Sequence, residues 1–182
     1  MKRDLKKINI IAGLFVFLLV FLFVLYAFRY DGKMDVLLSF DVEIIDGVEV
    51  EEILDILDRQ EVVGTFFIVG EYAEKNPSVI RRIADRHEVA CHTYSHVKMT
   101  KISDLEKREE LVKCREVLEE ISGAKVGGFR APWHALDLKT LLILEEEGFL
   151  YDASVPEGLG WMYPSVADVG IGEVPVSTFL MV

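Results

Sequence analysis

The stretch VLLSFDVEIIDGVEVEEILDILDRQEVVGTFFIV, residues 36–69, contains two short apolar runs separated by an amphipathic segment. The runs at 36–40 and 62–69 have the length and composition of buried strands. Residues 48–59 between them carry apolar side chains at helical spacing. Because parallel neighbours in a sheet need a crossover connection, the pattern predicts a strand, a helix and a second strand of a parallel α/β sheet.

The same alternation continues along the rest of the chain. A capping-box pattern from Ser103 to Glu106 and a Ser-Gly stop at Gly123 delimit the longest expected helix. Further helices are expected at 77–86, 103–121 and 137–147, and further short strands at 88–91, before Arg130, at 149–151 and at 172–176. We therefore expect a mostly parallel sheet or barrel with helices outside and chemistry at the carboxyl ends of the strands.

The N-terminal part differs in composition from this domain. Residues 8–28 contain no charge, and at about 1.5 Å per residue they are long enough to cross a hydrocarbon core of about 30 Å. A cleaved signal peptide is the alternative, but such apolar regions are usually shorter and end in a small-residue cleavage site. We therefore expect residues 1–33 to hold a cytoplasmic N-terminus, a single transmembrane anchor in the lipid bilayer and a short linker. Basic residues before the span place the remaining chain outside the cell.

The remaining chain is one strongly acidic domain. Of the 20 basic and 31 acidic residues in the 182-residue chain, residues 1–33 hold six and two, which leaves 14 against 29 in residues 34–182. Such a charge repels nucleic acid, so no nucleic-acid partner is expected. Its size leaves no room for a second domain.

Cys91 and Cys114 are the two cysteines of the chain. They have no Cys-x-x-Cys partner spacing, which argues against a zinc site built on Cys91. Two cysteines are also not a disulfide framework, so we interpret Cys91 as a small buried side chain and leave their pairing open.

His92 and His96 lie four residues apart after the expected strand at 88–91. If the segment is helical, both imidazoles share a face and can bind one divalent metal. A pair of surface or core histidines is the alternative.

Asp41 and Glu43 follow the first apolar run and would point the same way if the strand geometry continues. One carboxylate would complete a metal site of two histidines and a carboxylate, and the other would act as a general base. Both could instead cap the loop that follows.

These residues resemble the polysaccharide deacetylase family, also called the NodB homology domain. The resemblance covers residues 36–176, with its motifs in the family's order. It is carried by Ser39 to Glu43, Gly64 to Gly70, Asn76-Pro77, His87 to His96 and Gly128 to Trp133. It implies a distorted barrel of strands and helices, a divalent metal (zinc, or else cobalt or nickel), and removal of N-acetyl groups from a polysaccharide such as chitin or peptidoglycan.

The resemblance also implies roles for individual residues. His92 and His96 match the metal ligands, and Thr93 matches a hydroxyl residue that braces their loop. Arg130 matches the arginine that orients the catalytic aspartate.

Three further positions match the motifs that follow. Pro132 and Trp133 continue the arginine motif, in which the main-chain N–H at Trp133 helps bind the oxyanion. Asp152 resembles part of a groove-lining motif.

One departure concerns the first motif, where Val42 stands in place of a second aspartate. The sequence resembles a Phe-Asp-Val-Glu variant subgroup, so we assign Asp41 as the base and Glu43 as the third ligand, with the two roles exchangeable.

The other departure is that no residue matches the last family motif, whose histidine serves as general acid. We therefore expect residues 34–182 to be incomplete at the C-terminus. The leading hypothesis is a metal-dependent carbohydrate de-N-acetylase. A catalytically silent domain that binds glycan or a partner, and an amidase acting on small ring amides, are the alternatives.

Overall fold

The structure, a computed structural model, describes residue 18, residues 36–43, residues 47–156 and residues 170–175. The chain divides into two units, Met1–Val36 and Leu37–Val182, and the second contains all the elements below. Except for Leu18, the predicted membrane span at 8–28 lies outside the described residues. No helix within the described part is both long enough and apolar enough for a membrane crossing.

The described residues of the second unit form a six-stranded parallel sheet. Its strands are β1 (Leu38–Val42), β2 (Gly64–Ile68), β3 (Glu88–Cys91), β4 (Gly128–Phe129), β5 (Tyr151–Asp152) and β6 (Gly172–Glu173). The helices are α2 (Gly47–Gln60), α3 (Gly70–Lys75), α4 (Pro77–Ala84), α5 (Asp104–Ser122) and α6 (Leu138–Glu146), with short 3-10 helices η1 (Met99–Lys101) and η2 (Pro132–His134).

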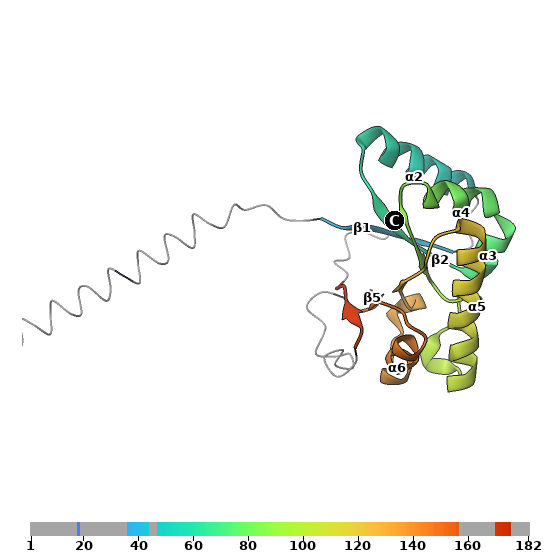
Figure 1. The fold of residues 1–182 in the computed structure, drawn as a ribbon, viewed down its shortest axis with the longest axis vertical. Coiled ribbons are helices and arrows are strands. Elements are labelled where there is room, and N and C mark those ends of the chain that lie inside the picture. Colours follow the sequence, from blue (N-terminus) through green and yellow to red (C-terminus); the bar gives the residue numbers. More distant parts are fainter. Residues whose placement is uncertain (1–17, 19–35, 44–46, 157–169, 176–182) are drawn as a thin grey trace, which may run out of the picture. The chain divides into compact units, whose positions relative to one another are not determined.

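The strands are ordered in the sheet as they are in the sequence, from β1 to β6. Crossovers between parallel strands are right-handed as a rule, and with this strand order they place the connecting helices on the same face of the sheet. In Figure 1, α2, α4, α3 and α5 lie in an arc beside β1 and β2. The α/β class and the parallel sheet are confirmed. No pairing joins β6 to β1 within the described ranges, so closure into a barrel stays a prediction.

The first strand begins two residues later than the apolar run predicted. Leu38 pairs with Gly64 and Val42 with Ile68, whereas Val36 and Leu37 precede the strand and are 67% and 79% exposed. Hydrophobicity alone cannot fix this boundary, because a strand extends only as far as its neighbour pairs with it. As a result, Asp41 lies within β1 and Glu43 directly follows it.

Helix α5 begins and ends as predicted. Ser103 accepts a hydrogen bond from the Glu106 N–H, and the Glu106 carboxylate accepts one from the Ser103 N–H, which is the capping box. At the other end Gly123 has a φ of 70°, which a glycine adopts without strain. Local signals suffice here because every group involved lies within one turn of the helix end.

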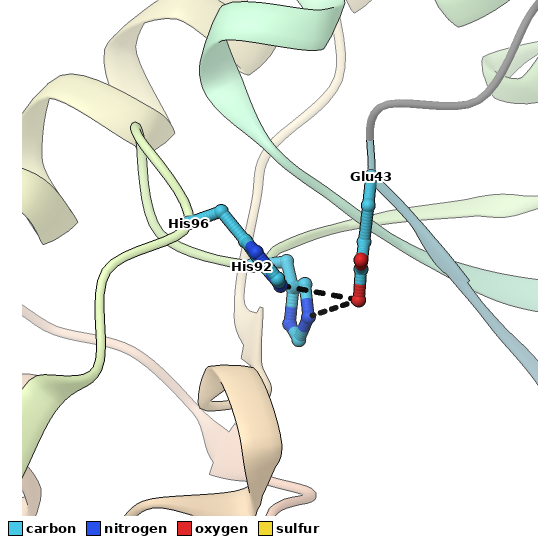
Figure 2. A group of neighbouring side chains, drawn as sticks. All are labelled: Glu43, His92 and His96. Atoms are coloured by element: carbon cyan, nitrogen blue, oxygen red, sulfur yellow. Dashed lines mark ion pairs between the residues drawn. The ribbon is translucent and has the colours of Figure 1, made fainter.

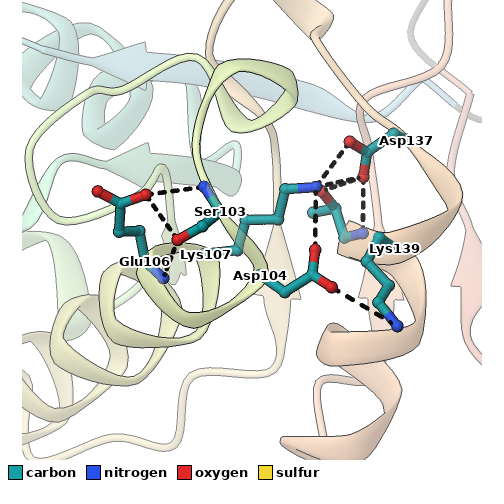
Figure 3. A network of polar contacts seen from close by, with 7 residues as sticks. Ser103, Asp104, Glu106, Lys107, Asp137 and Lys139 are labelled. Carbon is teal, nitrogen blue, oxygen red and sulfur yellow. Dashed lines mark hydrogen bonds and ion pairs between the residues drawn. The ribbon is translucent and has the colours of Figure 1, made fainter.

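A buried lysine joins α5 to α6 (Figure 3). Lys107 is 4% exposed and donates hydrogen bonds to both carboxylate oxygens of Asp137, at 2.9 and 2.7 Å. Asp137 also caps α6 by accepting from the Thr140 N–H at 2.8 Å. One ion pair therefore fixes where α6 begins relative to α5.

Helix α3 was not predicted, because six residues are too few to show a helical period. Its first residue, Gly70, lies against Tyr94: a Cβ at this position would be 2.6 Å from the Tyr94 ring. The glycine therefore allows the segment after β3 to pack closely on α3.

Cys91 at the end of β3 and Cys114 on α5 form a disulfide, with their Cα atoms 6.1 Å apart. Both side chains are fully buried, as expected for Cys91. The bond connects α5 to the residue directly before His92.

We expect loss of this disulfide to lower the free energy of unfolding by about 3 kcal/mol, because the bond closes a loop across 23 positions of sequence in the unfolded chain. Denaturant unfolding of the oxidised chain and of a Cys91→Ala/Cys114→Ala variant measures the difference. Reductant should destabilise only the chain that retains both cysteines. Equal unfolding midpoints for the two proteins would contradict the prediction.

Candidate metal centre and adjoining site

The polar residues that follow the strands gather at one edge of the sheet. Glu43 follows β1, His92 follows β3, and Arg130 follows β4. Because all these strands are parallel, their carboxyl ends lie at the same edge. This sheet edge holds the candidate site.

Three side chains at this edge form a compact group of metal-binding type (Figure 2). The ligand atoms of Glu43, His92 and His96 all lie within 4.8 Å of one another. Glu43 Oε1 is 3.8 Å from His92 Nε2 and 3.1 Å from His96 Nε2. Two imidazoles and a carboxylate match a common donor set for zinc and other divalent transition metals.

The two histidines converge without a helix, contrary to the geometry considered for their spacing. Residues 92–96 form a loop in which Thr93 and His96 have φ values of 62° and 58°. These two left-handed residues turn the chain back, so that residues four apart meet through a bend rather than through a helical turn. The Thr93 carbonyl also accepts a hydrogen bond from the Gly70 N–H at 3.1 Å. The Thr93 hydroxyl is buried and has no hydrogen-bond partner among the described residues.

The hydrogen bonds of the two imidazoles fit a metal ion. His92 is 1% exposed, and its Nδ1 lies 2.7 Å from the Arg130 carbonyl, which can only accept, so Nδ1 carries the proton and Nε2 offers a lone pair towards Glu43. His96 Nε2 is buried without a hydrogen bond to any described residue. A buried nitrogen that lacks a hydrogen bond has a partner once a cation binds.

The charge states of the group fit as well. Burial lowers the pKa of His96 below its usual value, which favours the neutral imidazole that binds metals. The pKa of Glu43 is also lowered, chiefly by the neighbouring His92 side chain, so this carboxylate is ionised at neutral pH. Two imidazole nitrogens and one carboxylate oxygen thus face the same point.

Asp41 lies beside this group and is held by Arg130. The guanidinium donates from Nη1 to Asp41 Oδ1 at 2.6 Å, from Nη2 to the Ser39 hydroxyl at 2.9 Å, and from Nε to the Ala153 carbonyl at 2.9 Å. Its charged centre also lies 4.0 Å from the Phe67 ring centroid. Because partners on three sides fix the buried Arg130, the orientation of the Asp41 carboxylate is fixed too.

Trp133 borders the group from η2. Its indole is 61% exposed, and the ring centroid lies 4.5 Å from that of His96. Its φ of 55° belongs to the left-handed region, and its N–H lies in the first turn of η2, where an amide has no partner inside the helix. A groove beside the group is lined by His96, Val97, Lys98, Lys101, Ile102 and Trp133.

Asp152 does not line this groove. It is fully buried and accepts hydrogen bonds from the Ser154 N–H at 2.9 Å and the Ser154 hydroxyl at 2.6 Å. Ser154 Oγ in turn accepts from the Ala131 N–H at 2.8 Å. Through Ser154, Asp152 therefore helps to hold the main chain at Ala131, between Arg130 and Trp133.

A second carboxyl group, that of Glu173 on β6, interacts with Asp152. The pKa of Glu173 is raised to about 8, mainly by burial and secondly by the charge of Asp152. Burial raises the pKa of Asp152 as well. Two adjoining carboxyl groups away from water cannot both ionise readily, so the folded protein keeps a proton on the pair at neutral pH.

This retained proton predicts a loss of stability at alkaline pH. The unfolded chain releases the proton near the ordinary pKa of 4.5, whereas the folded chain holds it to about 8, so the free energy of unfolding falls as pH rises between these values. We expect Glu173→Gln, which cannot ionise, to show a smaller fall in urea unfolding between pH 5 and pH 8. Glu120→Gln, at an exposed position of α5, should keep the wild-type slope. An unchanged slope in Glu173→Gln would refute the prediction.

Sequence reasoning missed two residues that support this site. Glu110 on α5 accepts a hydrogen bond from the Tyr94 N–H, in the loop between the two histidines. Ser154 connects Asp152 to Ala131, the residue after Arg130. Glu110 had a detectable signal, since it is an acidic residue next to the buried stripe of Lys107, Leu111, Cys114 and Leu118. Ser154 acts through its hydrogen bond with Ala131, 23 residues away in the sequence, and no pattern of neighbouring residues predicts this contact.

The fold and the site together define a class of protein: an α/β domain with a parallel sheet and a candidate centre of two histidines and a carboxylate at its carboxyl edge. A family model described as polysaccharide deacetylase matches residues 29–151, about two thirds of the chain. The chain belongs to the polysaccharide deacetylase family.

Individual relatives agree with this membership. The chain is 35% identical over 132 residues to a peptidoglycan-N-acetylglucosamine deacetylase of Bacillus cereus, a match covering 69% of the chain and 46% of that enzyme. It is 38% identical over 108 residues to a chitooligosaccharide deacetylase of Sinorhizobium fredii, covering 56% of the chain and 48% of the relative. The chain thus spans about half the length of these curated relatives.

A solved structure also resembles this fold. A Mycobacterium smegmatis protein assigned to the polysaccharide deacetylases superposes with a TM-score of 0.67 at 31% identity, covering 78% of this chain and 58% of that one.

Proposed function

We propose that the chain is a metal-dependent hydrolase that removes N-acetyl groups from an extracytoplasmic polysaccharide, with zinc as the metal. One observation carries the proposal: Glu43, His92 and His96 converge beside the Asp41 carboxylate that Arg130 holds. The names of the Bacillus and Sinorhizobium relatives support an N-acetylated sugar as the substrate.

The proposed roles follow from the chemistry of each side chain. Glu43, His92 and His96 would hold the metal, which supplies polarisation of the acetyl carbonyl and a water molecule of lowered pKa. Asp41 takes the proton from the attacking water as a general base. Arg130 holds the Asp41 carboxylate in a fixed orientation.

Trp133 has two proposed roles. Its main-chain N–H donates to the oxygen of the acetyl group as negative charge develops there. Its exposed indole, next to the groove, offers a flat apolar surface on which a sugar ring can stack.

Acetate release tests the proposed function. The purified full chain in neutral detergent is treated with a chelator and supplied with an N-acetylglucosamine oligomer, with and without zinc or cobalt. Metal-dependent release of acetate is the expected result. Zinc binding without release would favour the silent glycan-binding domain, and turnover of a small ring amide in place of the oligomer would favour the alternative amidase.

We also retain the anchor at residues 8–28, with the N-terminus in the cytoplasm and the domain outside, on the strength of the uncharged apolar stretch. Carbonate extraction of membranes and protease treatment of intact cells test this arrangement. Release into the supernatant, or protection of the domain in intact cells, would refute it.

A further inference from the structure

The loop that carries both histidines is held by one carboxylate on α5. Glu110 Oε2 accepts hydrogen bonds from the Tyr94 N–H and the Ser95 N–H, both at 2.9 Å, and Glu110 Oε1 accepts from the Ser95 hydroxyl at 2.6 Å. Both carboxylate oxygens are therefore occupied by the two residues between Thr93 and His96.

These bonds act on a loop that is unfavourable by itself. Thr93 and His96 are non-glycine residues in the left-handed region, and each such residue costs on the order of 1 kcal/mol or more. The bend turns two successive main-chain N–H groups towards one point, and such a concave arrangement binds anions. The Glu110 carboxylate is the anion at that point, so it stabilises the bent conformation over extended ones.

Helix α5 holds the same segment at a second place. Cys114, one helical turn after Glu110, is bonded to Cys91, the residue before His92. Side chains four residues apart lie on the same face of a helix, so the two attachments share one face of α5. The disulfide fixes where the loop begins, and Glu110 fixes how it bends.

We propose that Glu110 is a positioning residue of the metal centre, whose carboxylate holds residues 93–96 in the bend that directs His92 and His96 towards one ion. This inference rests on the proposed metal site. Glu110 itself has its oxygens on the loop amides and hydroxyl and acts through the histidines. No family motif quoted above includes it.

Zinc affinity of the full chain, measured by competition with a chromophoric chelator, tests the proposal. We expect Glu110→Ala to bind zinc about 10- to 100-fold more weakly, as is typical when a group that orients metal ligands is removed. Glu110→Gln keeps an amide oxygen able to accept the two N–H groups, so its affinity should lie between those of wild type and Glu110→Ala. Glu109→Gln, at the exposed neighbouring position, is the matched control and should bind as wild type does.

A cobalt absorption spectrum and the thermal midpoint of the metal-free protein separate positioning from stability. If Glu110 positions the ligands, Glu110→Gln should alter the cobalt spectrum while the protein remains folded. A lower midpoint with wild-type zinc affinity and an unchanged spectrum would overturn this inference and leave the proposed function standing. A wild-type chain that binds no zinc would overturn both.

Discussion

Replacing His92 by alanine is expected to reduce the proposed deacetylation by about 1000-fold or more, because the proposed chemistry depends on a cation that acidifies water and polarises the amide. His92 offers its Nε2 to the centre, and no other described side chain can take that place within the cluster of Glu43, His92 and His96. The same substitution should eliminate tight zinc binding. Zinc titration and acetate release, measured on the same preparation, check both consequences.

His96→Ala should behave in the same way, since its Nε2 is the buried nitrogen without a hydrogen-bond partner among the described residues. The matched control is His87→Asn. His87 is also buried, but its Nδ1 accepts a hydrogen bond from the Gly64 N–H far from the candidate centre, and asparagine can keep that acceptor. Loss of zinc in the His87 variant, or wild-type zinc affinity in the His92 and His96 variants, would show that the centre is assigned to the wrong residues.

Asp41→Asn is expected to lower kcat by about 100- to 10,000-fold while zinc affinity stays within a few-fold of wild type. An amide cannot take a proton as the carboxylate does, and a general base contributes about this much to rate. Glu43→Gln, in contrast, is expected to lower zinc affinity, because the oxygen 3.1 Å from His96 Nε2 no longer carries charge.

This pair of variants decides between two assignments that the sequence leaves exchangeable. In the structure Asp41 bonds to Arg130, whereas Glu43 approaches both histidines, and this geometry favours Asp41 as the base. If Asp41→Asn loses zinc and Glu43→Gln keeps it, the roles are reversed. Thermal unfolding must accompany the measurements, because Asp41→Asn leaves the buried Arg130 without its carboxylate partner.

Much of the architecture followed from short-range signals. The Ser103 capping box, the stop at Gly123 and the strand at Glu88–Cys91 were predicted because caps and apolar runs act within a few residues. The polar residues at the ends of β1, β3 and β4 were predicted to meet because parallel strands bring their carboxyl ends together. Helix α3 was not predicted because its six residues are too few to show a helical period. Its contact with Tyr94 is made through Gly70 and depends on the tertiary structure.

The sequence by itself determined the parallel α/β class, the order of the elements and the residue types at the candidate centre, because periodicity and motif spacing are properties of neighbouring residues. Only the tertiary structure decided which groups touch. Asp41 and Arg130 are 89 residues apart, and Glu110 reaches Tyr94 across 16, so their contacts depend on strand register and helix packing. The same holds for the Cys91–Cys114 bond and for the proton between Asp152 and Glu173. Such contacts form where the folded sheet and helices bring side chains from distant parts of the sequence together, so they cannot be predicted from patterns among neighbouring residues.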